Sequence, residues 1–286
     1  MLEKRPPPSK FVEDMSTRIR RRADTYADSV TEFLELEHRQ RRRTTETPLL
    51  DLFTLHTEAV VETYDPPGIR RAGDSLVFTG IYAPLLTHTA TSTSTPMAVN
   101  VLLAALIAAE VEFRGPLRLS RTQNRLLAEV YERLGPPLVQ AGLPAHAVLA
   151  YRRAGSLYRI DEDPDAEDRC GLAQARARRL AQPVSWKRIG GWIPDLICGY
   201  GYRPFRMLWF VAVQLLVFVV AVLLRSDQPP AVTVFQVLMN YLNPLGVGDT
   251  ENLLVGGRAI FVIESYLGAV TMSVFFALLV RRWFRL

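Results

Sequence analysis

Two long apolar runs in the last third of the chain constrain its fold more than any other feature. Residues 207–224 and 259–280 contain no Lys or Arg, and arginines flank both runs. At about 1.5 Å of helix rise per residue, each run covers most or all of a hydrocarbon layer about 30 Å thick. Surface helices of soluble proteins carry a polar face, which these runs lack. The sequence therefore predicts two membrane-spanning helices, the first slightly short.

The remaining composition indicates a charged domain in front of this hairpin. The chain has 286 residues and a net charge of +5, and much of the excess charge lies beside the apolar runs. That position relates to membrane topology rather than to nucleic acid, which is not an expected partner. Cys170 and Cys198 are too far apart for a CxxC site, so a reducing cytosol is the default interpretation. The four histidines lack metal-ligand spacing and no nucleotide-binding fingerprint is present, so neither an enzyme nor a cofactor is expected.

Residues 1–47 form a basic segment that we expect to be a partly disordered or helical arm. Between its two arginine clusters, Val30, Phe33, Leu34 and Leu36 form a thin apolar stripe. Such an arm could bind anionic lipid or nucleic acid. The alternative is a solvated tail, which the composition favours.

Residues 48–170 are expected to be a cytoplasmic, mostly helical domain. Within it, Leu76-Val77-Phe78 is a strand-like run, and Val111, Phe113, Leu117 and Leu119 alternate loosely, as a short strand would. The apolar segment 97–111 is shorter than a usual span, so a buried or interfacial helix is favoured over a third crossing of the membrane.

Residues 128–160 have the small residues of an αα-hairpin at spacings like those of a single tetratricopeptide unit. Gly142 falls near the expected turn, while Ala147 and Ala154 would let the two helices approach. Pro136 and Pro137 lie where the first helix should continue, and prolines break or kink helices. The acidic run 161–168 is expected to be a loop and at most a weak cation site.

Residues 171–206 form a basic and aromatic segment just before the first span, as a headgroup interface favours. The candidate lipid-interface residues there and after the second span are Trp186, Lys187, Arg188, Trp192, Arg203, Arg206, Arg281 and Arg282. The connection 226–257 contains no Lys or Arg. Both termini, including the basic tail 281–286, are therefore expected on the cytoplasmic side of the inner membrane.

The connection between the spans has the pattern of a re-entrant loop. Prolines precede residues 231–242, which could form a short helix, and Pro244 ends it. The filter-like segment 243–249 then carries the candidate ion-filter residues Pro244, Leu245, Gly246, Val247, Gly248 and Asp249. Glycines let backbone carbonyls aim inward, and the C-terminal end of a short helix favours a cation. Non-helical backbone at membrane depth is tolerated where it lines a cavity. These features predict a cation filter shared by several chains.

This arrangement resembles the two-transmembrane potassium-channel pore domain. The family pattern is a pore helix, then Thr-Val-Gly-Tyr-Gly-Asp, then Gly-Arg opening an inner helix that carries a glycine. The chain has 244–249, Gly257-Arg258 and Gly268 in that order, and ICGYGYRPFRML at 197–208 is similar to the lead-in of bacterial proteins with a cytoplasmic N-terminal region. The resemblance covers roughly 185–286 and implies a homotetramer that conducts a monovalent cation such as potassium.

The filter departs from the family pattern at three positions. Asn243 and Pro244 replace threonines, and Val247 replaces the aromatic residue. Glu264 and Gly268 are candidate pore-associated residues of the second span. Glu264 could act on ions or only bond to the pore helix, while Gly268 could bend for gating or only allow close packing.

Two functions remain open at this point. The first is a subunit of a potassium-like channel that is gated or assembled through its N-terminal domain. The second is a non-conducting, membrane-anchored interaction protein with a degenerate pore, whose N-terminal domain binds a cytoplasmic protein. The glycines at 246 and 248 favour the channel, whereas Pro244 and Val247 favour the anchored module.

Overall fold

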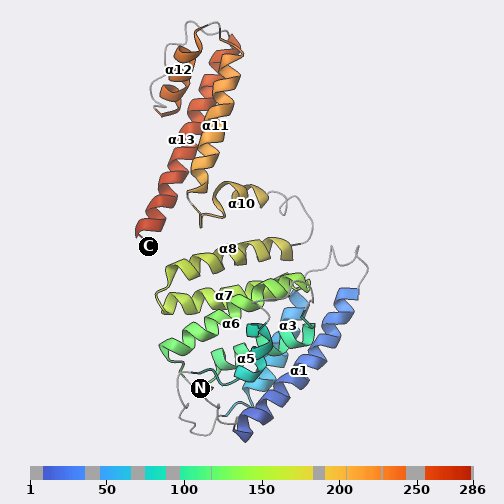
Figure 1. Ribbon diagram of the computed structural model, residues 1–286. Coiled ribbons are helices and arrows are strands. Elements are labelled where there is room, and N and C mark those ends of the chain that lie inside the picture. The colour runs from blue at the N-terminus through green and yellow to red at the C-terminus, as the bar shows by residue number, and fades with distance from the viewer. Residues whose placement is uncertain are drawn as a thin grey trace. The chain divides into compact units, whose positions relative to one another are not determined.

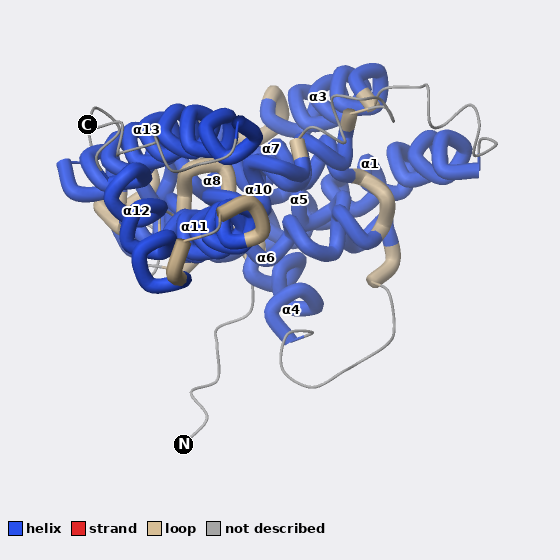
Figure 2. The backbone as a smooth tube through the Cα atoms, turned by 90° about the horizontal axis from the view of Figure 1, so that it is seen from above, coloured by secondary structure: helices blue, strands red, loops and turns tan. Residues whose placement is uncertain are grey.

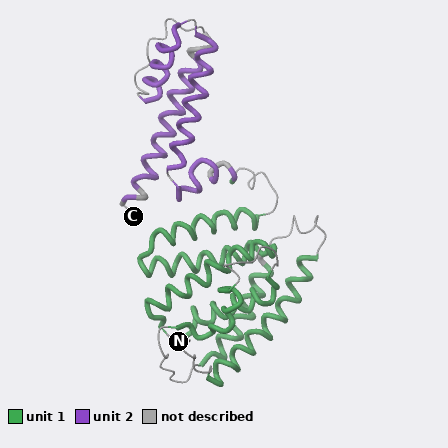
Figure 3. The backbone as a smooth tube through the Cα atoms, viewed as in Figure 1, with its two compact units in different colours: residues 1–191 green, residues 192–286 purple. Residues whose placement is uncertain are grey.

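The computed structural model describes residues 9–35, 46–65, 75–87, 97–116, 118–182, 191–203, 205–226, 228–242 and 255–284. Every regular element in these ranges is an α-helix and none is a strand, which confirms the mainly helical fold (Figures 1 and 2). The chain divides into two compact units, residues 1–191 and 192–286 (Figure 3).

Unit 1 contains the helices α1 (Lys10–Glu35), α3 (Thr47–Val61), α4 (Thr79–Thr87), α5 (Val99–Arg114), α6 (Arg121–Gln140), α7 (Pro144–Ile160) and α8 (Pro164–Ala181). Unit 2 contains α10 (Trp192–Cys198), α11 (Arg206–Leu223), α12 (Pro230–Leu242) and α13 (Val255–Phe284). The expected basic segment 171–206 is therefore shared between the units, and its first part belongs to α8.

Helix α1 is packed into the core of unit 1 instead of projecting as an arm. Its buried residues follow the helical repeat closely: Met15, Ile19, Ala23, Tyr26 and Val30. This stripe lies against α5 and α3, while the opposite face carries the arginines. The predicted stripe from Val30 to Leu34 is only the C-terminal end of this longer face, and Leu36 lies outside the described residues.

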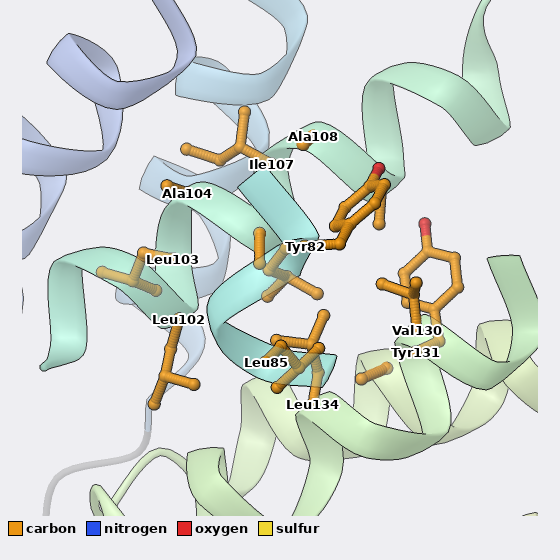
Figure 4. Packing of buried hydrophobic residues seen from close by; sticks show 14 of the residues in the cluster. Tyr82, Leu85, Leu102, Leu103, Ala104, Ile107, Ala108, Val130, Tyr131 and Leu134 are labelled. Atoms are coloured by element: carbon orange, nitrogen blue, oxygen red, sulfur yellow. The ribbon is translucent and has the colours of Figure 1, made fainter. Parts of the chain in front are cut away.

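Helix α5 is the centre of unit 1. All residues from Leu102 to Glu112 are buried, and α1, α3, α4 and α6 all pack against this helix. Figure 4 shows side chains of α4, α5 and α6 meeting in this core. The segment 97–111 is thus a buried helix, as favoured, because its apolar faces are covered by unit 1 itself.

The two expected strands are wrong. Val111 and Phe113 lie within α5, and Leu76–Phe78 form the approach and turn that lead into α4. Leu117 lies outside the described residues. Short apolar runs do not separate helix from strand by periodicity alone, and here the helix continues past its most apolar part.

A buried carboxylate holds α5 to its neighbours. Glu110 is fully buried, and its two oxygens accept hydrogen bonds from Arg114 at 2.8 Å, from Arg153 at 2.8 and 3.0 Å, and from the Tyr131 hydroxyl at 3.0 Å. Guanidinium groups of α5 and α7 thus compensate one carboxylate, and the Tyr131 hydroxyl of α6 adds a third partner. Because two guanidinium groups share this carboxylate, loss of either one still leaves Glu110 paired with the other.

The predicted αα-hairpin is present as α6 and α7, and α8 packs on α7 as a third helix. Gly142 has a φ of 79° at the turn, and Ala147 and Ala154 are completely buried. Helix α6 runs through Pro136 and Pro137 to Gln140, so the expected break does not occur.

The acidic run 161–168 is not a loop, because α8 begins at Pro164. The Asp163 side chain caps α8 by accepting from the Ala166 amide at 3.0 Å. Asp161 and Glu167 pair with Arg121 and Arg159. These carboxylates therefore have partners within the protein and do not form the weak cation site.

Candidate functional site

Unit 2 contains two helices that are long and apolar enough to cross a membrane. They are Arg206–Leu223, with a mean hydropathy of 2.4, and Ala259–Val280, with a mean hydropathy of 1.8. Only 22% and 17% of these stretches are buried within the chain, in contrast to the covered helix α5. Within the described part of unit 2, most of their apolar surface is therefore uncovered. The two predicted apolar segments are therefore helices of sufficient length and hydropathy to be candidate spans, and they are α11 and α13.

Helix α12 lies between these spans in sequence and packs on both of them. It covers Pro230–Leu242, close to the predicted 231–242, and it starts at a proline whose missing amide costs nothing in the first turn. The filter-like residues 243–249, from Asn243 to Asp249, lie outside the described residues.

A buried polar pair joins the end of α12 to α13. The Asn240 amide donates to Glu264 Oε2 at 3.0 Å and to the Phe261 carbonyl at 3.0 Å. Glu264 is 0% exposed and Asn240 is 2% exposed. The second oxygen of the carboxylate, Oε1, is also buried and has no hydrogen-bond donor among the described residues.

A second polar contact joins all three long helices of the unit. Gln214 Oε1 on α11 faces the Tyr241 hydroxyl of α12 at 3.4 Å and the Thr271 hydroxyl of α13 at 3.3 Å. Gly268 of α13 lies against Tyr241, since a methyl group placed on this glycine would come within 3.1 Å of the Tyr241 carbonyl oxygen. This close approach favours the packing role for Gly268 over a bending role, and α13 runs through it without a break.

The electrostatics of this polar cluster are unusual for such an apolar unit. Polar side chains inside a membrane pair with one another and cost free energy when they remain unpaired. Glu264 has only the neutral Asn240 as its described side-chain partner, and its free Oε1 can accept one further donor. Asn240 and Tyr241 contribute to the cluster from the last turn of α12. The cluster therefore fixes the C-terminal end of α12 against α11 and α13.

Sequence reasoning missed four members of this cluster. They are Gln214, Asn240, Tyr241 and Thr271. The available signal was a polar residue inside each of three otherwise apolar helices, which in a membrane indicates contact between helices.

The predicted lipid-interface residues are distributed over several structural environments. Trp186, Lys187 and Arg188 lie outside the described residues. Trp192 is 57% exposed on α10, and Arg203 is exposed in the turn that follows. Arg206 begins α11 and donates to the Asp195 carbonyl at 3.4 Å. Arg281 and Arg282 belong to the last turns of α13, and their side chains are not described.

The Gly199-Tyr200-Gly201 sequence forms a turn after α10. All three residues have positive φ values, of 56°, 54° and 86°. The Gly201 and Arg203 amides donate to the Cys198 carbonyl at 3.1 Å. Glycine adopts such backbone angles readily, whereas Tyr200 does so at a cost.

Comparison of the chain with protein-family models, curated proteins and solved structures found no match. Within the described ranges, no group of three or more His, Cys, Asp or Glu side chains could hold a metal ion. The functional argument therefore depends on the chain's own geometry.

Proposed function

We propose that the chain is a subunit of an oligomeric, potassium-like cation channel in the inner membrane, with both termini in the cytoplasm and unit 1 controlling gating or assembly. The observation that carries the proposal is the short helix α12, bracketed by two apolar helices and joined to the second by the buried Asn240–Glu264 pair. The polypeptide that leaves α12 is the glycine-containing segment 243–249.

The physical chemistry of this order of elements suits a cation. The C-terminal end of a helix carries a partial negative charge, and α12 ends where the glycine segment begins. Gly246 and Gly248 permit the backbone angles with which successive carbonyls can face one axis. Four copies are proposed from the resemblance to the two-transmembrane pore, because a filter of this type needs several chains around one axis.

The first experiment is cation flux into liposomes that contain the purified full-length protein, with potassium, sodium and N-methylglucamine compared. We expect potassium flux that Gly246→Ala reduces to background, because the added methyl group restricts the filter backbone. Gly155→Ala is the matched control, since its methyl group would meet only Cys170 Cβ at 3.9 Å in unit 1. Crosslinking must show the same oligomer for all three proteins. Unchanged flux in Gly246→Ala would contradict the filter assignment.

The second candidate function is a non-conducting, membrane-anchored interaction protein that binds a cytoplasmic partner through unit 1. Pro244 and Val247 favour it, because proline fixes φ and removes an amide donor, and valine cannot replace the hydrogen bond of an aromatic hydroxyl. Absence of flux from a correctly inserted oligomer, across a range of pH and voltage, would select this function.

A further inference from the structure

Three helices of unit 1 line a pocket, open to solvent, that the proposed pore does not use. Its volume is about 310 Å³. The lining residues are Arg20 and Asp24 from α1, Gly80, Ile81 and Pro84 from α4, and Asn100, Val101 and Ala104 from α5. Pockets for small molecules start at about 300 Å³, so this one suits a ligand of modest size.

The inner wall of the pocket is apolar. Ile81 and Ala104 are 4% and 6% exposed, and the half-buried Val101 and the exposed Pro84 add further apolar lining. A methyl group placed on Gly80 would meet no described atom within 4 Å, so the glycine leaves open space at the wall. This wall can accept an aliphatic group.

The rim of the pocket carries one cation and one anion that do not pair with each other. Arg20 and Asp24 are four residues apart on α1, a spacing at which ion pairs commonly form. Instead, Asp24 Oδ1 accepts from the Asn100 amide at 3.0 Å. The Arg20 guanidinium has no hydrogen bond or ion pair within the part of the chain that the structure describes. Both charges remain available to a ligand.

We infer that this pocket binds a small zwitterion with an aliphatic side chain, that is, an α-amino acid. The Arg20 guanidinium receives the carboxylate, as guanidinium groups do with paired hydrogen bonds. Asp24 receives the ammonium group, and its bond to Asn100 holds the carboxylate in place. The side chain of the ligand lies against Ile81, Val101 and Ala104. This inference is independent of ion conduction by unit 2.

The test is equilibrium binding of radiolabelled L-leucine to the full-length protein in lipid nanodiscs. We expect saturable binding that unlabelled L-leucine displaces. The analogues 4-methylpentanoate and 3-methylbutylamine each lack one charged group, and a lost charged hydrogen bond weakens binding about 10- to 100-fold. Both should therefore compete only at correspondingly higher concentration.

Variants connect the binding to this pocket. Gly80→Leu fills the open space and should abolish binding, while Arg20→Gln and Asp24→Asn should each weaken it about 10-fold or more. Arg21→Gln is the matched control, because Arg21 is exposed on the same helix and does not line the pocket. Thermal melting establishes whether each variant is folded. If Gly80→Leu does not fold, the binding measured for Arg20→Gln decides whether the pocket is the binding site. Absence of saturable leucine binding, or wild-type binding in folded Gly80→Leu, would overturn the inference, whatever the flux experiment shows.

Discussion

At the scale of single residues, unit 1 contains two glycines on adjacent helices, and only one of them has room for a side chain. A methyl group on Gly135 of α6 would lie within the ring of Tyr151. A methyl group on Gly155 of α7 would make only ordinary contact with Cys170. The first glycine is thus required by the approach of α7, whereas the second occupies a helix position where alanine fits.

The Gly135→Ala variant should therefore be destabilised by about 1–3 kcal/mol, because Tyr151 must move within a closely packed core. For a unit of this size, the melting temperature should fall by roughly 2–12 °C. Gly155→Ala should melt at the wild-type temperature or slightly above it, since alanine favours helix by up to about 1 kcal/mol over glycine. Circular dichroism of the full chain in detergent measures both. Equal melting of the two variants would contradict the contact with Tyr151.

At the scale of elements, helix α6 has a local signal at its start and unfavourable residues near its end. Ser120 and Gln123 form a capping box, in which the Ser120 side chain accepts from the Gln123 amide and the Gln123 side chain accepts from the Ser120 amide at 2.9 Å. The helix then continues through Pro136 and Pro137, where packing of α6 on α7 retains it. The start of α6 depends on local hydrogen bonds and its end depends on tertiary contact.

Replacement of Ser120 by Ala should consequently cost about 1 kcal/mol, the usual value for loss of an N-cap side chain. The expected fall in melting temperature is about 2–4 °C. Thr25→Ala in α1 is a suitable control, because the Thr25 hydroxyl only bonds to the Arg21 carbonyl within the helix. Its effect should remain within about 0.5 kcal/mol. If the melting temperature fell as much in Thr25→Ala as in Ser120→Ala, the loss could not be attributed to the N-cap hydrogen bond.

At the scale of the whole molecule, the two units use apolar helices in different ways. Unit 1 covers α5 with its own helices, and the core extends from Met15 of α1 to Ala177 of α8. Unit 2 leaves side chains such as Leu216, Val217 and Val262 more than half exposed. The core of unit 1 also contains several buried tyrosines on different helices, so its stability depends on keeping them neutral.

Alkaline pH should therefore destabilise unit 1 as a whole. Burial raises the pKa of Tyr151 to about 12 and that of Tyr131 well above its ordinary value. Tyrosines of the unfolded chain ionise near pH 10, so the unfolded state loses protons first and stability falls as the pH rises above about 10. Each such group removes up to about 1.4 kcal/mol per pH unit in this range.

Melting temperatures measured between pH 8 and pH 11 test this expectation. Tyr151→Phe keeps the ring and removes the titrating hydroxyl. It should match the wild type at pH 8 and exceed it at pH 11. A melting temperature that stays constant above pH 10 would show that the buried tyrosines do not govern the stability of the unit.

Much of the candidate site was visible in the sequence, because its signals are local. Apolar length indicated α11 and α13, and the positions of Pro229 and Pro230 indicated where α12 begins. The buried nature of 97–111 followed from its length. The strands at 76–78 and 111–119 were wrong because short apolar segments have no decisive period. The glycine-containing filter segment remains a prediction from the sequence alone.

The sequence by itself determined the mainly helical class, the two long apolar helices and the short helix between them, since backbone hydrogen bonding and apolar length act within one segment. The tertiary structure alone decided which polar groups meet. Asn240 and Glu264 are 24 residues apart, and Asp24 and Asn100 are 76 residues apart. No local pattern encodes such pairs, because they depend on how separate helices pack. The packing of α1 against α5 is another case, and it placed Arg20 and Asp24 at the rim of a pocket.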